Sequence, residues 1–135
     1  MKDSLTVGLA TTRRITVDKS RTIGFMGEAV RVYATPALVL DIERICRALL
    51  LEHCDPGEDS VGTRIELDHM AATLLDQWVE ITVTVDEVAR RKVGFTVKAE
   101  DAVEAVARGR HDRFVVDIAK TEARLKAKAA KLAEG

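Results

Sequence analysis

The sequence predicts an α+β fold in which one long helix is followed by an antiparallel sheet. Residues 36–53 supply the helix, because Ala, Leu, Arg and Glu dominate them and Pro36 suits a first helical turn. From residue 79 onward, apolar residues recur at every second position, which is the period of a strand. The links between these later strands are as short as hairpins, and hairpins join antiparallel neighbours.

Length and composition bound the class of protein. The chain has 135 residues, 47% hydrophobic and 32% charged, as expected for one domain over residues 1–135. Its 21 basic and 22 acidic side chains leave a formal net charge of −1, which argues against a dedicated nucleic-acid binder. No apolar run reaches the roughly 18 residues of a membrane span, and the first residues lack the apolar core of a secretory signal. We therefore expect a cytoplasmic protein with no nucleic-acid or membrane partner.

The first half of the chain is predicted to hold two short strands and the long helix. The strands cover residues 5–8 and 13–17, and residues 18–34 are irregular. The helix ends at the breakers Asp55-Pro56-Gly57. A strand-like stretch over residues 63–70 comes next.

The second half is predicted to form the sheet and a final helix. Strands over 79–85 and 93–99 flank a turn at Arg90-Arg91-Lys92. Residues 103–107 and 114–118 form either one long strand or two short ones. An Ala/Lys-rich helix with five basic and two acidic residues covers 119–134.

The long helix is apolar on most of its surface, so other elements must cover it on most sides. A sheet curved around the helix meets this requirement. Such a sheet keeps an exposed edge, which a second copy of the chain can cover. We therefore expect a homodimer, and the sequence leaves a higher oligomer open.

The two cysteines indicate neither a disulfide nor a metal site. Cys46 and Cys54 lie eight residues apart, which is about 12 Å along a helix, whereas a disulfide needs Cα atoms within about 7 Å. No other cluster of Cys and His has the spacing of metal ligands. We expect two thiols and no metal.

Glu43 is a candidate functional residue because a helical wheel places it on the apolar face of the helix. Its neighbours on that stripe are Val39, Cys46 and Leu50, and the predicted solvated stripe opposite holds Asp41, Arg44 and Glu52. An unpaired charge is costly to bury, so Glu43 needs partners or a raised pKa, and both are typical of working groups. Two structural interpretations stay open, namely a Glu at a dimer interface and a Glu paired with Arg47.

Other candidate residues each have an ordinary structural interpretation as well. His69 ends the strand-like stretch, and a lone histidine is more often structural than catalytic. Thr35 is at the natural N-cap of the helix, and Gly62 suits a turn. His111 lies in the charged run Arg108 to Arg113, which is most simply a solvated strand face.

Taken together, Thr35, Glu43, Gly62 and His69 resemble the hotdog-fold thioesterases of the fluoroacetyl-CoA thioesterase-like group. The resemblance covers about residues 1 to 125 in the same order. The matching pieces are Tyr33-Ala34-Thr35, Asp55-Pro56-Gly57-Glu58, Val61-Gly62-Thr63, the run from His69 to Thr73, and Arg110-His111-Asp112-Arg113.

The resemblance implies a hotdog fold, in which an antiparallel sheet wraps a central helix and two copies dimerise edge to edge, with active sites at the interface. It implies that Thr35 is the catalytic hydroxyl, Glu43 the catalytic carboxylate and His69 the catalytic imidazole. Gly62 would bring a backbone N–H close to the acyl group. Arg113 matches an arginine near the family's pocket, and a role as charge partner of Glu43 stays open.

The implied function is hydrolysis of a small or medium acyl-CoA thioester to free acid and CoA. No cofactor is expected, since coenzyme A is part of the substrate. Residues 22–34 are compact and hold only Phe25 and Tyr33 as aromatics, so selectivity for the fluorinated substrate is not carried over.

The sequence leaves one other function open, disfavours another and offers one further binding site. The alternative function is a non-catalytic acyl-thioester binding protein on the same fold. A hydratase is disfavoured, because it presents an Asp and a His several residues apart whereas Asp68 and His69 are adjacent. The basic residues of 90–92 and 119–134 suit either a solubilising surface or the phosphates of coenzyme A.

Overall fold

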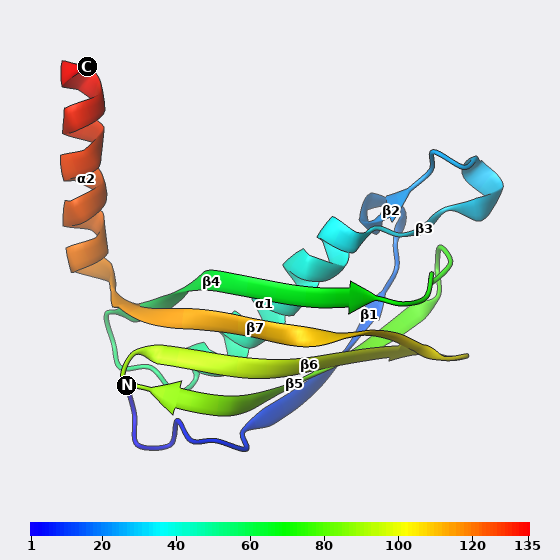
Figure 1. Ribbon diagram of the computed structural model, residues 1–135, viewed down its shortest axis with the longest axis horizontal. Helices are drawn as coiled ribbons and strands as arrows, with labels where there is room; N and C mark the ends of the chain where they lie inside the picture. Colours follow the sequence, from blue (N-terminus) through cyan, green and yellow to red (C-terminus); the bar gives the residue numbers. More distant parts are fainter.

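A long helix, α1 (Thr35–Leu51), lies against a five-stranded antiparallel sheet in the computed structural model, which describes residues 1–135 (Figure 1). The strand order across the sheet is β1-β5-β6-β7-β4, and every pairing is antiparallel. The strands are β1 (Ala10–Thr16), β4 (Glu58–His69), β5 (Trp78–Ala89), β6 (Lys92–Asp101) and β7 (Ala105–Asp117).

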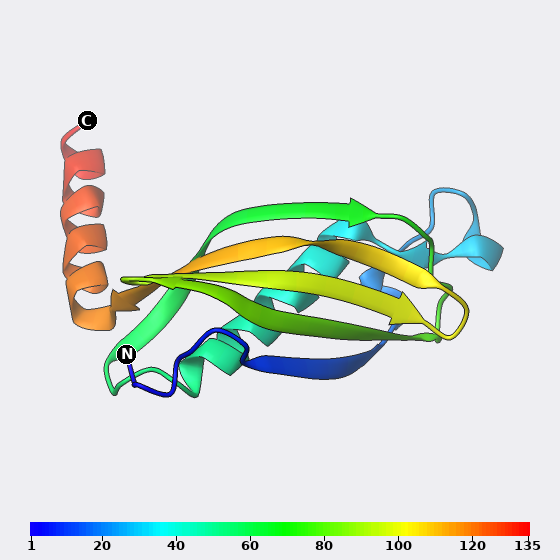
Figure 2. The same cartoon turned by 60° about the horizontal axis from the view of Figure 1, so that its bottom comes forward.

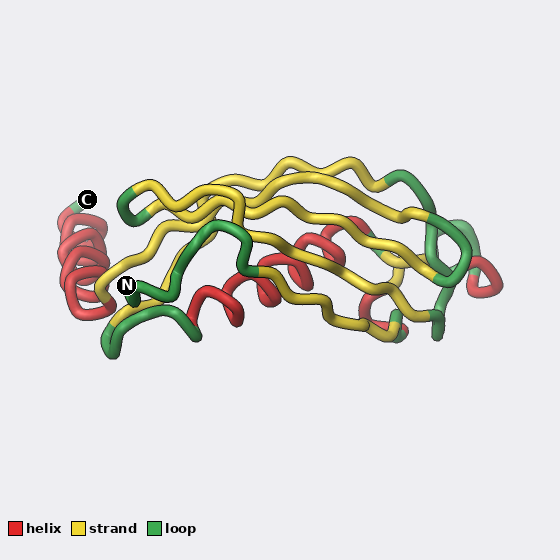
Figure 3. Tube along the Cα trace, turned by 90° about the horizontal axis from the view of Figure 1, so that it is seen from below, coloured by secondary structure: helices red, strands yellow, loops and turns green.

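The sheet arches over α1, and the core fills the space between them (Figures 2 and 3). The alternating apolar residues of β5 all face the helix and are fully buried, as are Leu38, Ile42 and Leu50 on α1. The predictions of a central helix and a curved antiparallel sheet are therefore confirmed. The outer face of the sheet keeps the alternate polar residues, as expected for a sheet covered on one side.

The first strand of the structure differs from the prediction, and the alternative left open for the last strand is resolved. The strand predicted over residues 5–8 does not form. Val7 and Gly8 lie in a turn, and Gly8 has a φ of +102°, which a strand does not accept. The strand predicted over 13–17 begins earlier, at Ala10, and pairs with β5. The alternative left open for residues 103–118 is resolved as one continuous strand, β7.

The segment between β1 and α1 carries only short elements. Two 3₁₀ turns, η1 (Lys19–Arg21) and η2 (Glu28–Val30), accompany a small ribbon of β2 (Thr22–Ile23) and β3 (Val32–Tyr33). This ribbon pairs with itself and lies beside the start of α1 (Figure 1). The predicted irregular character of residues 18–34 holds for most of the segment.

The C-terminal helix α2 (Ile118–Glu134) begins directly after β7. The Asp117 carboxylate accepts the backbone N–H of Lys120 and so caps the helix. No residue of α2 is buried. The helix leaves the end of the sheet and extends past the β4 edge (Figures 1 and 2).

Strand β4 forms one edge of the sheet. It pairs with β7 on one side only, and a bulge shifts its register between Gly62 and Arg64. Two of its apolar side chains, Val61 and Ile65, remain exposed at 45% and 38%. A twelve-residue edge with apolar side chains is the kind of surface that other strands pair with.

The helix surface differs from the prediction at Asp41. The helical wheel predicts a solvated position for Asp41, yet this residue is buried, because the segment 18–33 folds back over that side of α1. The Asp41 carboxylate accepts hydrogen bonds from the Tyr33 hydroxyl and from Nε (2.9 Å) and Nη2 (3.2 Å) of Arg21. A buried carboxylate is tolerated there because it is fully engaged.

Two further observations concern the cysteines and the helices. Cys46 and Cys54 are both free thiols, as predicted, and both are buried. Neither α1 nor α2 combines the length and the apolar character that a helix needs to cross a bilayer.

Candidate active site

Thr35 and His69 meet where α1 begins and β4 ends. The hydroxyl Oγ1 of Thr35 lies 2.7 Å from Nδ1 of His69, which is a hydrogen bond between residues 34 positions apart. The N-cap interpretation of Thr35 is wrong: Ala34 is the N-cap, and no side chain caps the helix. Since Thr35 is the first residue of the helix itself, its hydroxyl is free to bond with the imidazole.

The environment of His69 favours a neutral imidazole. Burial lowers the pKa of His69 below its ordinary value of 6.5, because a charged ring is poorly solvated there. Its Nε2 atom is buried and has no hydrogen-bond partner within the chain. The ring of Tyr33 stands edge-on to it, with centroids 6.4 Å apart. A neutral imidazole beside a hydroxyl is an arrangement that can move protons in a hydrolytic reaction.

A small cavity of about 230 Å³ opens beside this pair. Thr35 and His69 line it together with mostly apolar neighbours: Ile23, Val32, Tyr33, Met70, Ala71 and Ala72. The β2–β3 ribbon and the residues after β4 thus supply the walls. Sequence reasoning did not identify Ile23 or Val32, because no periodic pattern links the ribbon to the helix start.

Glu43 and Gly62 belong to a second group, farther along α1 and β4. A Cβ atom at Gly62 would lie 3.6 Å from Oε2 of Glu43, 3.5 Å from Nη1 of Arg113 and 3.2 Å from Cε1 of His111. Glycine therefore leaves space where these three side chains converge on the strand. Glu43 is half-buried, and its carboxylate makes no hydrogen bond within the chain.

Arg113 is held firmly in this second group. Its Nε and Nη2 atoms donate to Oγ (2.7 Å) and to the carbonyl oxygen (2.8 Å) of Ser60, and Nη1 lies 3.2 Å from Nε2 of His111. Burial lowers the pKa of Arg113, and the negative charge of Glu43 opposes that shift. No direct ion pair joins Arg113 to Glu43, so the predicted charge partnership acts through space at most.

His111 fixes the orientation of Arg113 through its tautomer. Its Nδ1 lies 2.8 Å from the carbonyl oxygen of Arg64, so Nδ1 carries the proton and donates. Nε2 is then the acceptor for Nη1 of Arg113. Burial lowers the pKa of His111, which keeps the ring neutral and preserves this pattern.

The prediction that residues 108–113 form a solvated strand face is wrong for His111, Asp112 and Arg113, which are all buried. β7 lies inside the sheet between β6 and β4, and His111 and Arg113 share the face of buried Val115 toward α1. Counting back from apolar Val115 in steps of two indicates that Arg113 and His111 face the core, and this was the signal available in the sequence.

The structural interpretation in which Glu43 pairs with Arg47 is also wrong. Arg47 pairs with Asp59 on β4, with Nη2 and Oδ2 2.7 Å apart, and makes no ion pair with Glu43. The loop after α1 turns β4 back along the helix, and this brings Asp59 to Arg47.

The two groups lie apart within one chain. Thr35 and Glu43 are eight residues apart on α1, about 12 Å, and Gly62 and His69 are seven residues apart on β4, about 23 Å. No hydrogen bond joins Glu43 to Thr35 or His69. One chain therefore presents a hydroxyl–imidazole pair at one end of α1 and a carboxylate near its middle.

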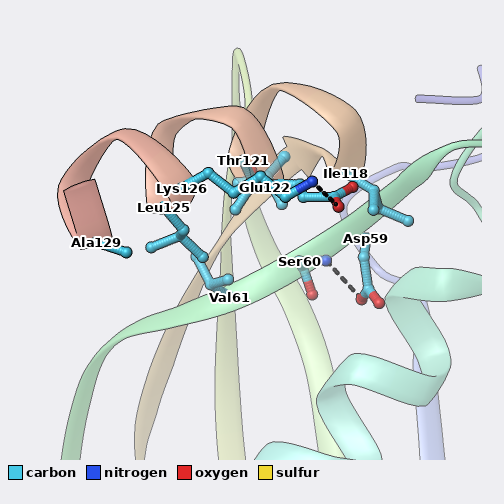
Figure 4. A pocket seen from close by; sticks show the side chains of 10 residues that line it. Asp59, Ser60, Val61, Ile118, Thr121, Glu122, Leu125, Lys126 and Ala129 are labelled. Carbon is cyan, nitrogen blue, oxygen red and sulfur yellow. Dashed lines mark hydrogen bonds and ion pairs between the residues drawn. The ribbon is translucent and has the colours of Figure 1, made fainter.

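The largest cavity, about 580 Å³, lies elsewhere, between α2 and the start of β4 (Figure 4). Val61, Ile118, Leu125 and Ala129 give it an apolar lining, and the Glu122–Lys126 pair (3.0 Å) stands at its side. No histidine or cysteine lines it, so it offers no hydroxyl–imidazole pair and resembles a packing surface.

Comparisons with known proteins agree with this architecture. A family model described as fluoroacetyl-CoA-specific thioesterase matches residues 17–119. The fluoroacetyl-CoA thioesterase of Streptantibioticus cattleyicolor is 30% identical over 135 residues, covering 95% of this chain and 97% of that protein.

Solved structures match over nearly the whole chain. A variant of the fluoroacetyl-CoA-specific thioesterase FlK has a TM-score of 0.85 at 30% identity, covering 94% of this chain and 99% of its own. A hot-dog-like protein from Thermanaerovibrio acidaminovorans has a TM-score of 0.83 at 29% identity, over 90% of this chain and 91% of its own. Variants of FlK have been crystallised with fluoroacetate and CoA and with acetyl-CoA. The predicted hotdog fold of the single chain is confirmed.

Proposed function

Because the chain belongs to the fluoroacetyl-CoA-specific thioesterase family, we propose that it hydrolyses a small or medium acyl-CoA thioester, using Thr35, Glu43 and His69. The observation that carries the proposal is the 2.7 Å contact between Thr35 and His69 beside an apolar cavity of about 230 Å³. The cavity suits a short apolar acyl group, and the adjacent pair supplies the proton chemistry that hydrolysis requires.

The reaction needs an oxygen nucleophile, a base and an acid. Neutral His69 takes the proton of the Thr35 hydroxyl, or of a water held by it, as the oxygen attacks the thioester carbonyl. The carbonyl π electrons move to oxygen, and a backbone N–H beside Gly62 donates to this oxyanion. Collapse re-forms the carbonyl and breaks the C–S bond, and the imidazolium of His69 protonates the departing thiolate. Attack by Thr35 itself would leave an ester that water then cleaves by the same steps.

Glu43 supplies negative charge and a second proton acceptor at the reacting centre. Its carboxylate makes no hydrogen bond within the chain, and the guanidinium of Arg113 lies on the far side of the space at Gly62. Packing alone does not explain an unengaged carboxylate on α1 that approaches β4 at Gly62. As a base or as an electrostatic partner of the imidazolium, it acts only if it comes close to His69.

A homodimer joined through β4 brings the two groups together. When two β4 strands pair antiparallel about a two-fold axis near Ile65, the His69 end of one strand lies opposite the Gly62 end of the other. Each site then combines Thr35 and His69 of one copy with Glu43 and Gly62 of the second. The unpaired β4 edge and its exposed Val61 and Ile65 support this pairing.

The test measures release of free thiol from a panel of acyl-CoAs that includes acetyl-CoA and fluoroacetyl-CoA. Glu43→Gln and His69→Ala are each expected to lower turnover by at least about 100-fold, as for acid–base groups. Glu52→Gln, an exposed glutamate at the end of the same helix, is the matched control and keeps wild-type turnover. Circular dichroism and light scattering check that the variants keep their fold and assembly.

Two outcomes would contradict the proposal. If no thioester is cleaved although one binds, the protein is a non-catalytic acyl-thioester binder. If Glu43→Gln or His69→Ala unfolds the protein instead of inactivating it, the residue concerned is structural.

A further inference from the structure

The C-terminal helix α2 has two chemically different faces. Its apolar stripe, with Ile118, Leu125 and Ala129, looks toward β4 across the cavity of Figure 4. A second stripe, about 125° around the helix, is basic and holds Lys120, Arg124, Lys128 and Lys131. Since no residue of α2 is buried, the packing of the chain does not explain the basic stripe.

The base of this stripe opens onto a second cavity, of about 310 Å³, between α2 and the outer face of the sheet. Lys120 and Arg124 line it from α2, and Arg91 reaches it from the β5–β6 turn. Phe114 of β7 contributes an aromatic ring that is 43% exposed. Three cations from two separate elements thus meet beside one open aromatic side chain.

The positive charge in this cavity is poorly neutralised. Lys120 and Arg124 form no ion pair, and Arg91 contacts Glu58 through a single 3.2 Å contact. Asp117 is the one carboxylate in the lining, and its Oδ1 already accepts the backbone N–H of Lys120. An anionic ligand would therefore find unpaired donors here.

We propose that this cavity binds the phosphorylated adenosine end of coenzyme A, with the phosphates on Arg91, Lys120 and Arg124 and the adenine on Phe114. Aromatic rings stack on nucleobases, and arginine and lysine bind phosphate oxygens, so the two kinds of side chain together select a nucleotide over a simple anion. The inference rests on the proposed function for its choice of nucleotide.

Two residues that line the cavity are sequence neighbours of Gly62, which borders the proposed reacting centre. Val61 and Thr63 line the cavity, and between them Gly62 faces Glu43 on the opposite side of β4. The pantetheine arm would pass around the β4 edge from the outer to the inner face. The dimer pairing described above leaves residues 58–61 beyond the end of the second β4 strand, which keeps that passage open.

The first experiment measures CoA binding by calorimetry, which requires no hydrolysis. Arg124→Glu and Lys120→Glu are each expected to weaken CoA binding by about tenfold, the worth of one charge-assisted hydrogen bond. Lys131→Glu is the matched control, because it makes the same charge change on the same stripe outside the cavity. Phe114→Leu weakens binding and Phe114→Tyr restores it. Wild-type affinity for CoA falls as ionic strength rises.

The second experiment separates binding of the nucleotide from chemistry on the acyl group. With acyl-CoA, Arg124→Glu raises KM about tenfold and leaves kcat unchanged, by the same loss of one charged contact. With the N-acetylcysteamine thioester of the same acyl group, which lacks the nucleotide, Arg124→Glu behaves like wild type.

The outcomes distinguish this inference from the proposed function. If Arg124→Glu and Lys131→Glu weaken CoA binding equally, or if neither does, the cavity is not the nucleotide site. If the wild type binds CoA in an Arg124-dependent manner and cleaves no thioester, the nucleotide site stands and the hydrolase proposal falls. A wild type that binds no CoA overturns the inference.

Discussion

At the scale of single residues, this site depends on side chains that are held in one chemical form. His111 donates through Nδ1 to Arg64 and accepts through Nε2 from Arg113, so a neutral ring of one tautomer sets the guanidinium. Arg113 in turn faces the space at Gly62 that Glu43 also borders. These residues border the proposed reacting centre on the inner face of the sheet, and each positions the next.

His111 is therefore expected to be a positioning residue. His111→Leu removes both hydrogen bonds and leaves a buried arginine donor unsatisfied, so kcat should fall about tenfold or more with KM little changed. His111→Gln keeps one donor and one acceptor and should restore most of kcat. Steady-state kinetics of the two variants provide the measurement. Equal losses in both, or an effect on KM alone, would contradict a positioning role.

The pH dependence of hydrolysis should follow the shifted pKa of His69. Because burial lowers this pKa, the imidazole remains a neutral base at pH values below 6.5, and the acidic limb of kcat/KM lies below 6.5. Rates measured at constant ionic strength from about pH 5 to about pH 8 test this. His111→Gln, which lacks the second buried histidine, should show the same limb. A limb at or above 6.5 that Glu43→Gln moves below 6.5 would mean that the charge of Glu43 from the second copy outweighs burial at His69. A limb at or above 6.5 that Glu43→Gln leaves in place would mean that His69 is not the base.

At the scale of elements, the segment between β1 and α1 is attached to the helix by polar contacts. Asp41 on α1 accepts hydrogen bonds from Tyr33 of β3 and from Arg21 of η1, and burial and this carboxylate both raise the pKa of Tyr33. The same ribbon supplies Ile23 and Val32 to the small cavity. The carboxylate on the far side of α1 thus stabilises a wall of the proposed acyl site.

Asp41→Asn should lower the free energy of unfolding by about 2 kcal/mol, because it removes the charge that Arg21 and Tyr33 bond to in a buried place. Urea denaturation gives the value. Asp68→Asn is the control, since Asp68 is exposed and its contact with Arg108 is 3.7 Å long, so stability should change by at most a few tenths of a kcal/mol. Similar losses in both variants would show that the Asp41 contacts contribute little.

At the scale of the whole molecule, the separation of the two proposed catalytic groups determines how the proposed active site would be assembled. α1 holds Thr35 and Glu43 about two turns apart, and β4 holds Gly62 and His69 at opposite ends of an unpaired edge. A rigid helix and strand cannot bring these ends together within one chain. The proposed pairing of two β4 edges would bring them together by symmetry.

Mixed dimers test this assembly directly. A heterodimer of a Glu43→Gln chain and a His69→Ala chain has one site with both substitutions and one site with neither, so it should recover about half of wild-type activity per dimer. Each homodimer of the same variants stays inactive. The heterodimer is purified with two different affinity tags and measured by thiol release. An inactive heterodimer would place Glu43 and His69 of one site in the same chain.

The sequence by itself determined the two helices, the central strands and the family. Periods of 3.6 and 2 in the apolar residues reflect local geometry, so α1, β5 and β6 were predictable from neighbours in the chain. The order of Thr35, Glu43, Gly62 and His69 carried the family resemblance. The boundaries at Thr35 and Ile118 differed by one residue from the prediction, since helix ends depend on caps.

Only the tertiary structure decided which polar side chains are buried and which of them meet. Asp41 and His111 looked solvated in the sequence, because a charged or polar residue is usually exposed. Asp41 is buried because the 18–33 segment covers it, and His111 is buried because β7 lies inside the sheet. The contact of Thr35 with His69 and the distance of Glu43 from both depend on where a helix and a strand end in space. Such long-range placement follows from packing across the whole chain, which no local pattern records.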